Sequence, residues 1–256
     1  MMVHESDRVV VVTGASAGIG AALARVLASR GHAVGLVARR REALNAVAAD
    51  CGSHARVIVA DMSRREEVAH AVEDALAGFG RIDVWVNNAG VGITRMPSQL
   101  TDADVDAMMR ANVMTALYGM QEVLPHFRSR GAGHIINVSS MLGRIPFATF
   151  RSAYCGAKHF LNALTDTFRA ELHETDPGIR VSLVSPGVVR TEFGVNAMHG
   201  GPDSRELPFS QSADEVAQVI ADVIDTPRAD VYTRSGSRQR VLDYFSSHGS
   251  DPEETR

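Results

Sequence analysis

The strongest constraint on the fold is the regular alternation of short, β-branched apolar runs with longer helical patterns. The first run, residues 9–12, consists of four valines and leads into Thr13-Gly14. A run without polar–apolar alternation is typical of a parallel strand that helices cover on both faces. Further runs of this kind lie at residues 33–38, 56–60, 82–87, 134–139, 181–185 and 231–233.

Strand–helix–strand units repeated in this way predict an α/β fold. Right-handed crossovers would arrange about seven strands in a doubly wound, Rossmann-like parallel sheet with helices on both faces. No linker or tandem repeat divides the chain, so we expect residues 1–256 to form a single domain.

Two stretches depart from the alternation. Residues 192–212 contain three glycines and two prolines, which predicts a mobile loop over the substrate. Residues 247–256 are polar, and we expect a frayed tail there. Between the fourth and fifth strands, Thr101 with Asp104 three residues later predicts a capped helix that runs through Leu124.

Three glycines, Gly14, Gly18 and Gly20, follow the first predicted strand and open a helix that ends at Gly31. A glycine-rich turn of this kind presents backbone N–H groups and the positive end of a helix dipole to a pyrophosphate. Their spacing is Gly-x-x-x-Gly-x-Gly, unlike the general Gly-x-Gly-x-x-Gly fingerprint. The turn predicts a dinucleotide-binding domain, although a tight turn without a ligand could use the same glycines.

Five motifs in a fixed order resemble those of the classical short-chain dehydrogenase/reductase family, and they cover most of residues 8–195. The resemblance implies an oxidoreductase that interconverts a carbonyl and an alcohol with a nicotinamide dinucleotide. The motifs are Thr13-Gly14-Ala15-Ser16-Ala17-Gly18-Ile19-Gly20, Asn87-Asn88-Ala89-Gly90, Ser139-Ser140, Tyr154-x-x-x-Lys158, and Pro186-Gly187 with Thr191.

The end of the second predicted strand bears on the cofactor preference. An acidic residue there would bind the adenosine ribose of NAD, but this chain has Arg39, Arg40 and Arg41 and no carboxylate before Glu42. Arginine offers a planar fork of donors to the 2′-phosphate of NADP. We therefore expect NADP (NADPH), although the arginines could form a solvated helix start. Many NADP-dependent family members carry a second basic residue where this chain has Ala17.

The resemblance extends the cofactor site along the chain. It places Asp61 and Met62 against the adenine, although Asp61 could instead, or in addition, cap a turn ahead of Ser63. The implied cofactor-binding residues are Gly14, Ser16, Ala17, Gly18, Ile19, Gly20, Arg39, Arg40, Asp61, Met62, Asn88, Ala89, Gly90, Tyr154, Lys158, Pro186, Gly187, Val189 and Thr191.

Tyr154 and Lys158 are four residues apart on a predicted helix and therefore share one face. A free phenol has a pKa of about 10, too high for efficient proton exchange near neutrality. A nearby ammonium stabilises the tyrosinate, and lowering the pKa by about three units takes roughly 4 kcal/mol. Alone, the pair is more typical of an ordinary helix surface. Within the ordered motifs, the resemblance makes Tyr154 the proton donor and acceptor, and Lys158 the residue that also holds the nicotinamide ribose.

Two further residues complete the catalytic set that the resemblance implies. Ser140 is the hydroxyl that polarises the substrate carbonyl, and Ser139 is the competing candidate. The interval from Ser140 to Tyr154 is about one residue longer than usual in the family, which predicts a small insertion. Asn112 matches the family residue that bends its helix and holds a water that relays protons to the lysine.

Composition and charge exclude several classes of partner. A net charge of −4 argues against nucleic acid or an anionic membrane, and no apolar run approaches the ~20 residues of a membrane helix. The polar start is unlike a secretory signal, and Cys51 and Cys155 form no Cys-x-x-Cys, so we expect a reduced, cytoplasmic protein. The histidines form no ligand group, and we expect no metal.

The substrate and the assembly are less constrained. An apolar bias favours a small, lipophilic ketone, aldehyde or alcohol, although core packing explains the same residues. Alternatives are an NAD-dependent alcohol dehydrogenase of this family, or a non-catalytic NADP-binding sensor that would lack Tyr154 or Lys158. Candidate pocket residues are Met141, Leu142, Ile145, Phe147, Phe150 and the 192–212 loop. The resemblance implies a homodimer or homotetramer, with candidate contacts at Met109, Val113, Leu117, Phe160 and Leu164.

Overall fold

The computed structural model describes residues 8–248, and seven parallel strands within them form one sheet. The strands are β1 (Val9–Thr13), β2 (Ala33–Ala38), β3 (Ala55–Val59), β4 (Val84–Asn87), β5 (Gly133–Val138), β6 (Ile179–Ser185) and β7 (Asp230–Tyr232). Their order, β3-β2-β1-β4-β5-β6-β7, confirms the doubly wound, Rossmann-like prediction. Every predicted strand is present, and the ends differ from the predicted ones by two residues or fewer.

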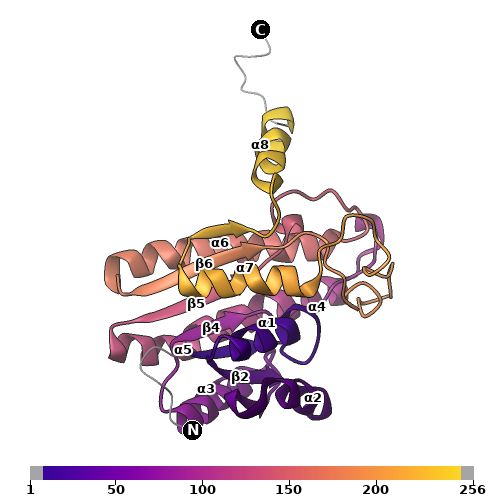
Figure 1. Ribbon diagram of the computed structural model, residues 1–256. Coiled ribbons are helices and arrows are strands. Elements are labelled where there is room, and N and C mark those ends of the chain that lie inside the picture. The colour runs from indigo at the N-terminus through magenta and orange to yellow at the C-terminus, as the bar shows by residue number, and fades with distance from the viewer. Residues whose placement is uncertain (1–7, 249–256) are drawn as a thin grey trace.

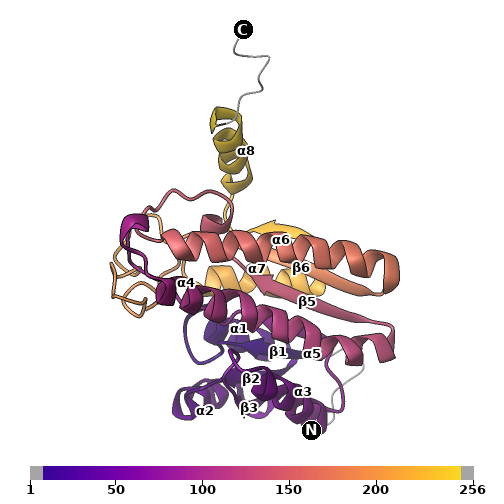
Figure 2. The same cartoon turned by 180° about the vertical axis from the view of Figure 1, so that it is seen from behind.

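Helices cover both faces of this sheet (Figures 1 and 2). They are α1 (Gly18–Ser29), α2 (Arg41–Cys51), α3 (Arg65–Phe79), α4 (Asp102–Met109), α5 (Thr115–Arg130), α6 (Ser152–Thr175), α7 (Ala213–Asp225) and α8 (Ser237–His248). The apolar faces of α1, α2 and α7 pack on one side of the sheet, and those of α3, α5 and α6 on the other. Within residues 8–248, no helix has the length and apolar character needed to span a membrane.

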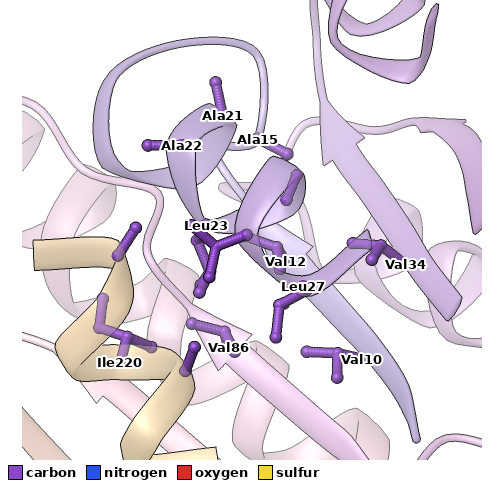
Figure 3. Packing of buried hydrophobic residues seen from close by; sticks show 14 of the residues in the cluster. Val10, Val12, Ala15, Ala21, Ala22, Leu23, Leu27, Val34, Val86 and Ile220 are labelled. Atoms are coloured by element: carbon purple, nitrogen blue, oxygen red, sulfur yellow. The ribbon is translucent and has the colours of Figure 1, made fainter. Parts of the chain in front are cut away.

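The central strand β1 shows why the strands are continuous apolar runs. Val10 and Val12 pack with Leu23 of α1 and Ile220 of α7 in one cluster (Figure 3), whereas Val11 belongs to the cluster on the opposite face. All four valines of β1 are therefore 0% exposed. Burying one such side chain contributes about 1.5–3 kcal/mol. This packing fixes the place from which the glycine turn departs.

The helix predicted from Thr101 through Leu124 is interrupted and longer than expected. Thr101 and Asp104 form the predicted capping box, and Thr101 Oγ1 accepts a hydrogen bond from the Asp104 N–H at 3.2 Å. After α4, the segment Arg110–Met114 adopts a π-helical turn. The chain then continues as α5 to Arg130, where Gly131, with a φ of 64°, ends the helix.

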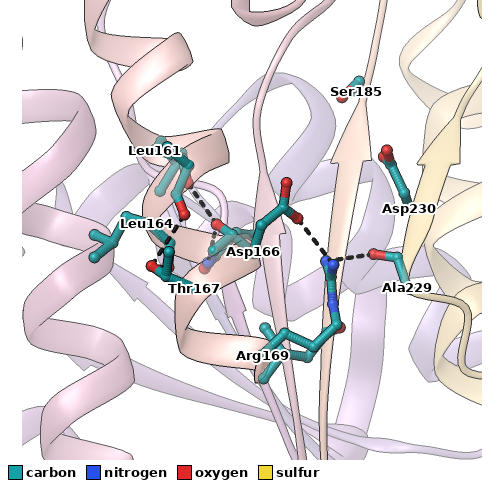
Figure 4. Close-up of polar contacts among 12 residues, drawn as sticks. Leu161, Leu164, Asp166, Thr167, Arg169, Ser185, Ala229 and Asp230 are labelled. Atoms are coloured by element: carbon teal, nitrogen blue, oxygen red, sulfur yellow. Dashed lines mark hydrogen bonds and ion pairs between the residues drawn. The ribbon is translucent and has the colours of Figure 1, made fainter. Parts of the chain in front are cut away.

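Helix α6 carries Tyr154, and Arg169 ties the second half of this helix to the sheet. The Arg169 guanidinium donates to the carbonyl oxygens of Val181 at 2.8 Å and Ala229 at 2.7 Å. It also donates to the Asp166 carboxylate at 2.8 Å (Figure 4). Val181 lies in β6 and Ala229 precedes β7, so these bonds hold the helix against the edge of the sheet.

The two segments predicted to be irregular have different outcomes. Within the described chain, residues 192–212 contain only turns, bends and isolated bridges, while the mobility of this loop stays a prediction. Ser247 and His248, the first residues of the tail predicted to be frayed at 247–256, end α8, and the rest of that tail lies outside the described residues, so its fraying stays a prediction. The sequence pattern does not predict α8 because Val241 is its one buried residue. This helix projects away from the sheet (Figure 1).

Candidate active site

A cleft of about 970 Å³ lies at the carboxyl ends of the strands. The strand order reverses between β1 and β4, and ligands of open α/β sheets bind outside such a switch point. Every residue predicted to be catalytic or to bind the cofactor lines this cleft, with the exception of Gly20. The structure thus brings the predicted residues together, while their individual roles stay predictions.

The glycine turn between β1 and α1 is shaped for close approach to an anion. Gly14 and Gly18 have φ angles of 66° and 54°, in the left-handed region that favours glycine. A Cβ on Gly20 would lie 2.3 Å from the Gly14 carbonyl oxygen, so Gly20 allows the helix to pack on the turn and does not line the cleft. Helix α1 has no side-chain cap and no acidic residue in its first turn. Its N-terminal N–H groups therefore fit a pyrophosphate.

Thr13 joins this turn to the end of β4, a role that the sequence motifs do not predict. Its Oγ1 accepts hydrogen bonds from the N–H groups of Asn88 at 3.0 Å and Ala89 at 3.1 Å. The same hydroxyl donates to the Val86 carbonyl oxygen at 3.1 Å. The sequence feature that marks Thr13 is a hydroxyl directly before Gly14, at the end of an otherwise apolar strand, and the structure buries this hydroxyl.

The end of the cleft beside β2 and β3 is basic. Arg39 and Arg40 are exposed and line it, and Arg40 Nη2 donates to Ser16 Oγ at 3.3 Å. Partial burial raises the pKa of Asp61, but hydrogen bonds from Ser63 and the charge of Arg39 outweigh burial and leave this pKa below its usual value. Asp61 forms a turn with Ser63 and also lines the cleft, so the two interpretations of this residue are compatible.

Tyr154 and Lys158 lie one turn apart on α6 and are both buried in the cleft wall. Lys158 Nζ donates to the Val138 carbonyl oxygen at 3.0 Å and lies 5.7 Å from the centre of the Tyr154 ring. Burial raises the pKa of Tyr154 to about 12, which a hydrogen bond with Ser140 offsets in part. Burial also lowers the pKa of Lys158 to about 8. Without a ligand, burial therefore outweighs the expected stabilisation of tyrosinate and keeps Tyr154 protonated, in the form that can donate a proton.

The two serines after β5 differ in what they contact. Ser139 Oγ donates to Asn162 Oδ1 at 2.5 Å, and Asn162 Nδ2 donates to the Gly143 carbonyl oxygen at 2.6 Å. Ser140 Oγ accepts from the Leu142 N–H at 3.1 Å and hydrogen-bonds with Tyr154. Ser139 is thus committed to holding the loop after β5, whereas Ser140 faces the tyrosine.

Asn112 lies in the π-helical turn and bridges it to the strand end of β4. Its Nδ2 donates to the carbonyl oxygens of Val91 at 2.9 Å and Met108 at 3.1 Å, and its Oδ1 accepts from the Val91 N–H at 3.3 Å. Gly90 fills the space between Asn112 and Lys158: its Cβ, if present, would lie 2.7 Å from Asn112 Oδ1 and 3.7 Å from Lys158 Nζ. π-Helical turns often occur at functional sites because they reposition one side chain.

The remaining end of the cleft differs from the predicted substrate pocket. Met141, Leu142, Phe147 and Phe150 line it as expected. Ile145 does not, because it is 2% exposed and packs with Val241 of α8 in a separate apolar cluster. Further residues that line this end of the cleft, and that no sequence motif predicts individually, are Val91, Gly92, Arg151, Glu192, Phe193, Asn196, Pro202, Ser204 and Leu207.

A family model described as short chain dehydrogenase matches residues 8–200. The chain therefore belongs to the short-chain dehydrogenase/reductase family and is an oxidoreductase of that type. Among its relatives, the Bacillus subtilis protein named uncharacterized oxidoreductase YxnA is 32% identical over 239 residues. The alignment covers 91% of this chain and 67% of that protein.

Solved structures share the fold over nearly the whole chain. A short-chain dehydrogenase/reductase from Burkholderia phymatum in complex with NAD has a TM-score of 0.84 and 24% identity, and covers 98% of this chain and 99% of its own. An alcohol dehydrogenase from the archaeon Thermococcus sibiricus complexed with 5-hydroxy-NADP has a TM-score of 0.75 and 27% identity, covering 88% and 95%. These structures therefore include both an NAD complex and a complex with a modified NADP.

Proposed function

We propose that this protein interconverts a carbonyl and an alcohol, prefers NADP(H), and uses Tyr154 as proton donor and acceptor. The observation that carries this proposal is the convergence of Tyr154, Ser140 and Lys158 at one end of a cleft whose other end is lined by Arg39 and Arg40. A single cleft can thereby join a dinucleotide to a carbonyl group beside a proton donor.

In the proposed reduction, Ser140 and Tyr154 hydrogen-bond the substrate carbonyl oxygen, and the Tyr154 hydroxyl transfers its proton to that oxygen. The nicotinamide ring, when bound, supplies the hydride that the carbonyl carbon receives. Lys158 stabilises the resulting tyrosinate through its positive charge. By family resemblance, Lys158 also holds the nicotinamide ribose, and Asn112 supports the relay that returns a proton to Lys158. Oxidation runs the same steps in reverse.

The reaction class is tested by following NADPH absorbance with a panel of ketones and aldehydes, for the protein and for Tyr154→Phe. The proposal expects turnover of at least one neutral or charged carbonyl compound, and its loss in the variant. A protein that binds NADPH but turns over no carbonyl or alcohol would support the sensor alternative.

The NADP preference rests on the two arginines after β2. Arg39 and Arg40 are exposed in the cleft and follow β2 directly, at the position where a carboxylate would repel a 2′-phosphate. Initial rates with equal concentrations of NADPH and NADH test this preference, with an expected ratio of at least about ten-fold, or 1.4 kcal/mol. Equal rates would favour the NAD-dependent alternative.

We also propose a homodimer or homotetramer formed through α5 and α6, and a cytoplasmic location. Of the candidate contacts, Phe160 on α6 is 50% exposed, whereas Val113 is 1% exposed and belongs to the core. Phe160 is thus the better interface candidate. The location is supported by Cys51 and Cys155, which are free and buried. Sedimentation that shows only monomer at micromolar concentration would contradict the assembly.

A further inference from the structure

Arg151, the residue immediately before α6, is buried without a charge partner. It is 7% exposed, and within residues 8–248 no carboxylate forms an ion pair with its guanidinium. Its side chain makes one hydrogen bond, from Nη1 to the Ile93 carbonyl oxygen at 3.2 Å. Arginine is rarely buried so deeply unless it is paired, and this one leaves most of its N–H donors unused by the described protein.

The guanidinium lies in the wall of the cleft, one helical turn before Tyr154. A Cβ on Gly92 would lie 2.9 Å from Arg151 Nη1, and a Cβ on Gly201 would lie 3.2 Å from Nη2. Glycine at both positions therefore lets the backbone pack closely against the guanidinium, which a side chain there would displace. Arg151 and Tyr154 are also close enough for the positive charge of Arg151 to lower the tyrosine pKa, which places both at the reacting end of the cleft.

A second unpartnered polar group lies close to Gly201. Thr94 Oγ1 is buried and has no hydrogen-bond partner in the described part of the chain, and it lies 2.6 Å from the position of a Gly201 Cβ. Ser204, which is 6% exposed and lines the cleft, adds a further hydroxyl on the facing loop. The unpaired guanidinium of Arg151, in the wall of the cleft near Tyr154, is therefore a donor for a ligand group that carries negative charge.

Nearby carboxylates are already engaged. Asp104 pairs with Arg95 at 3.0 Å and with His199 at 2.7 Å, so it does not neutralise Arg151. Glu192 lines the cleft but lies 3.5 Å from Arg205. The positive end of the α6 dipole adds to the charge of Arg151. This end of the cleft is therefore positively charged. Burial lowers the pKa of Arg151, but the arginine is still protonated at neutral pH.

We propose that the substrate carries a carboxylate, that Arg151 binds it, and that the enzyme therefore acts on oxo acids and the corresponding hydroxy acids. The guanidinium fork matches a carboxylate, which accepts two parallel hydrogen bonds. The carboxylate is unchanged in the reaction, because the hydride goes to the carbonyl carbon and the proton to its oxygen. This inference rests on the proposed carbonyl–alcohol chemistry and names the substrate class for the same site.

Apolar residues define the rest of the substrate. Leu142, Phe147 and Phe150 line the cleft, and Phe193 packs edge-on against Tyr154 with ring centres 5.5 Å apart. Hydrocarbon next to the carbonyl would contact these side chains, and the carboxylate would reach Arg151. The preferred substrate is accordingly an amphiphilic oxo acid, which is more specific than the small, lipophilic ketone, aldehyde or alcohol that the sequence favours.

The test compares 2-, 3- and 4-oxo acids of about five to ten carbons with their methyl esters, which keep the carbonyl and remove the charge. With NADPH, wild-type kcat/KM should be at least ten-fold higher for one acid than for its ester. Arg151→Gln should lower kcat/KM for that acid by about ten- to hundred-fold and change the ester by less than three-fold. Arg238→Gln, which removes an exposed arginine outside the cleft, should change neither.

If Arg151→Gln does not fold, Arg151→Lys distinguishes carboxylate binding by Arg151 from a role in holding the loop in place. It keeps the charge and loses the fork, and it should weaken acid turnover more than ester turnover. Equal losses for acid and ester, in either folded variant, would show that Arg151 only braces the loop and would overturn the inference. Wild-type turnover of esters without a preference for any acid would also overturn it while leaving the proposed function intact. Turnover of neither class would overturn the inference, and only a further failure with the ketone and aldehyde panel would contradict the proposed function.

Discussion

Replacing Gly90 with alanine should disturb the catalytic end of the cleft without removing any functional side chain. The new methyl group would lie 2.7 Å from Asn112 Oδ1, against the 3.4 Å of ordinary contact, a shortfall of about 0.7 Å. The φ of Gly90 is not in the left-handed region, so the backbone accepts alanine and the clash itself is the perturbation. Asn112, which is 1% exposed, must move.

The cost follows from what holds Asn112 in place. Its side chain makes four hydrogen bonds: Nδ2 donates to the carbonyl oxygens of Val91 and Met108 and to Met108 Sδ, and Oδ1 accepts from the Val91 N–H. Weakening one or two of these buried bonds costs about 1–3 kcal/mol in the free energy of unfolding. For a domain of this size, that cost lowers Tm by roughly 3–10 °C. Because Gly90 also adjoins Lys158, we expect kcat to fall by about 10- to 100-fold.

The assay pairs thermal melting with carbonyl reduction, and Gly156→Ala is the control. Gly156 lies between Tyr154 and Lys158 in sequence, but it is exposed, and apart from its chain neighbours and the adjacent backbone of its own helix no atom lies within 4 Å of its would-be Cβ. Alanine there should leave kcat unchanged and stabilise the helix by up to about 1 kcal/mol. If Gly90→Ala melts and turns over like the wild type, the tight placement of Asn112 against Gly90 has no role in stability or catalysis.

Three further predictions concern charge and proton transfer. Tyr154→Phe should bind NADPH normally, as measured by NADPH fluorescence, yet its kcat should fall by about 10²–10⁴-fold. If the variant keeps more than about a tenth of the wild-type rate, a residue other than Tyr154 transfers the proton. Arg39→Asp should shift the ratio of NADPH to NADH rates towards NADH, and an unchanged ratio would remove Arg39 from the cofactor preference. Lys158 has a pKa lowered from 10.5 to about 8, so its buried charge costs stability below pH 8, and this cost is relieved as pH rises towards 10.5. Urea unfolding should therefore show wild type gaining up to about 3 kcal/mol on Lys158→Met between those pH values, and parallel profiles would contradict the shift.

Local patterns along the chain predict the sheet and the backbone of the cofactor site. Buried parallel strands require continuous apolar runs such as residues 9–12, and a left-handed turn requires glycine at Gly14 and Gly18. Parallel strands end at one edge of the sheet, so the motifs that follow them meet there without further information. For this reason the predicted cofactor and catalytic residues, Gly20 apart, line one cleft.

Only the tertiary structure decides which neighbouring side chains face that cleft. Ile145 and Phe147 are two residues apart and equally apolar, yet Ile145 packs against α8 while Phe147 lines the cleft. Arg151 has no motif of its own, and its burial depends on Gly92 and Gly201, which lie 59 residues before it and 50 residues after it. Burial, orphaned donors and the pKa of a lysine are properties of such non-local packing. The order of the motifs along the sequence therefore determines which edge of the sheet carries the active site. The three-dimensional packing determines the charge and shape of the cleft that a substrate enters there.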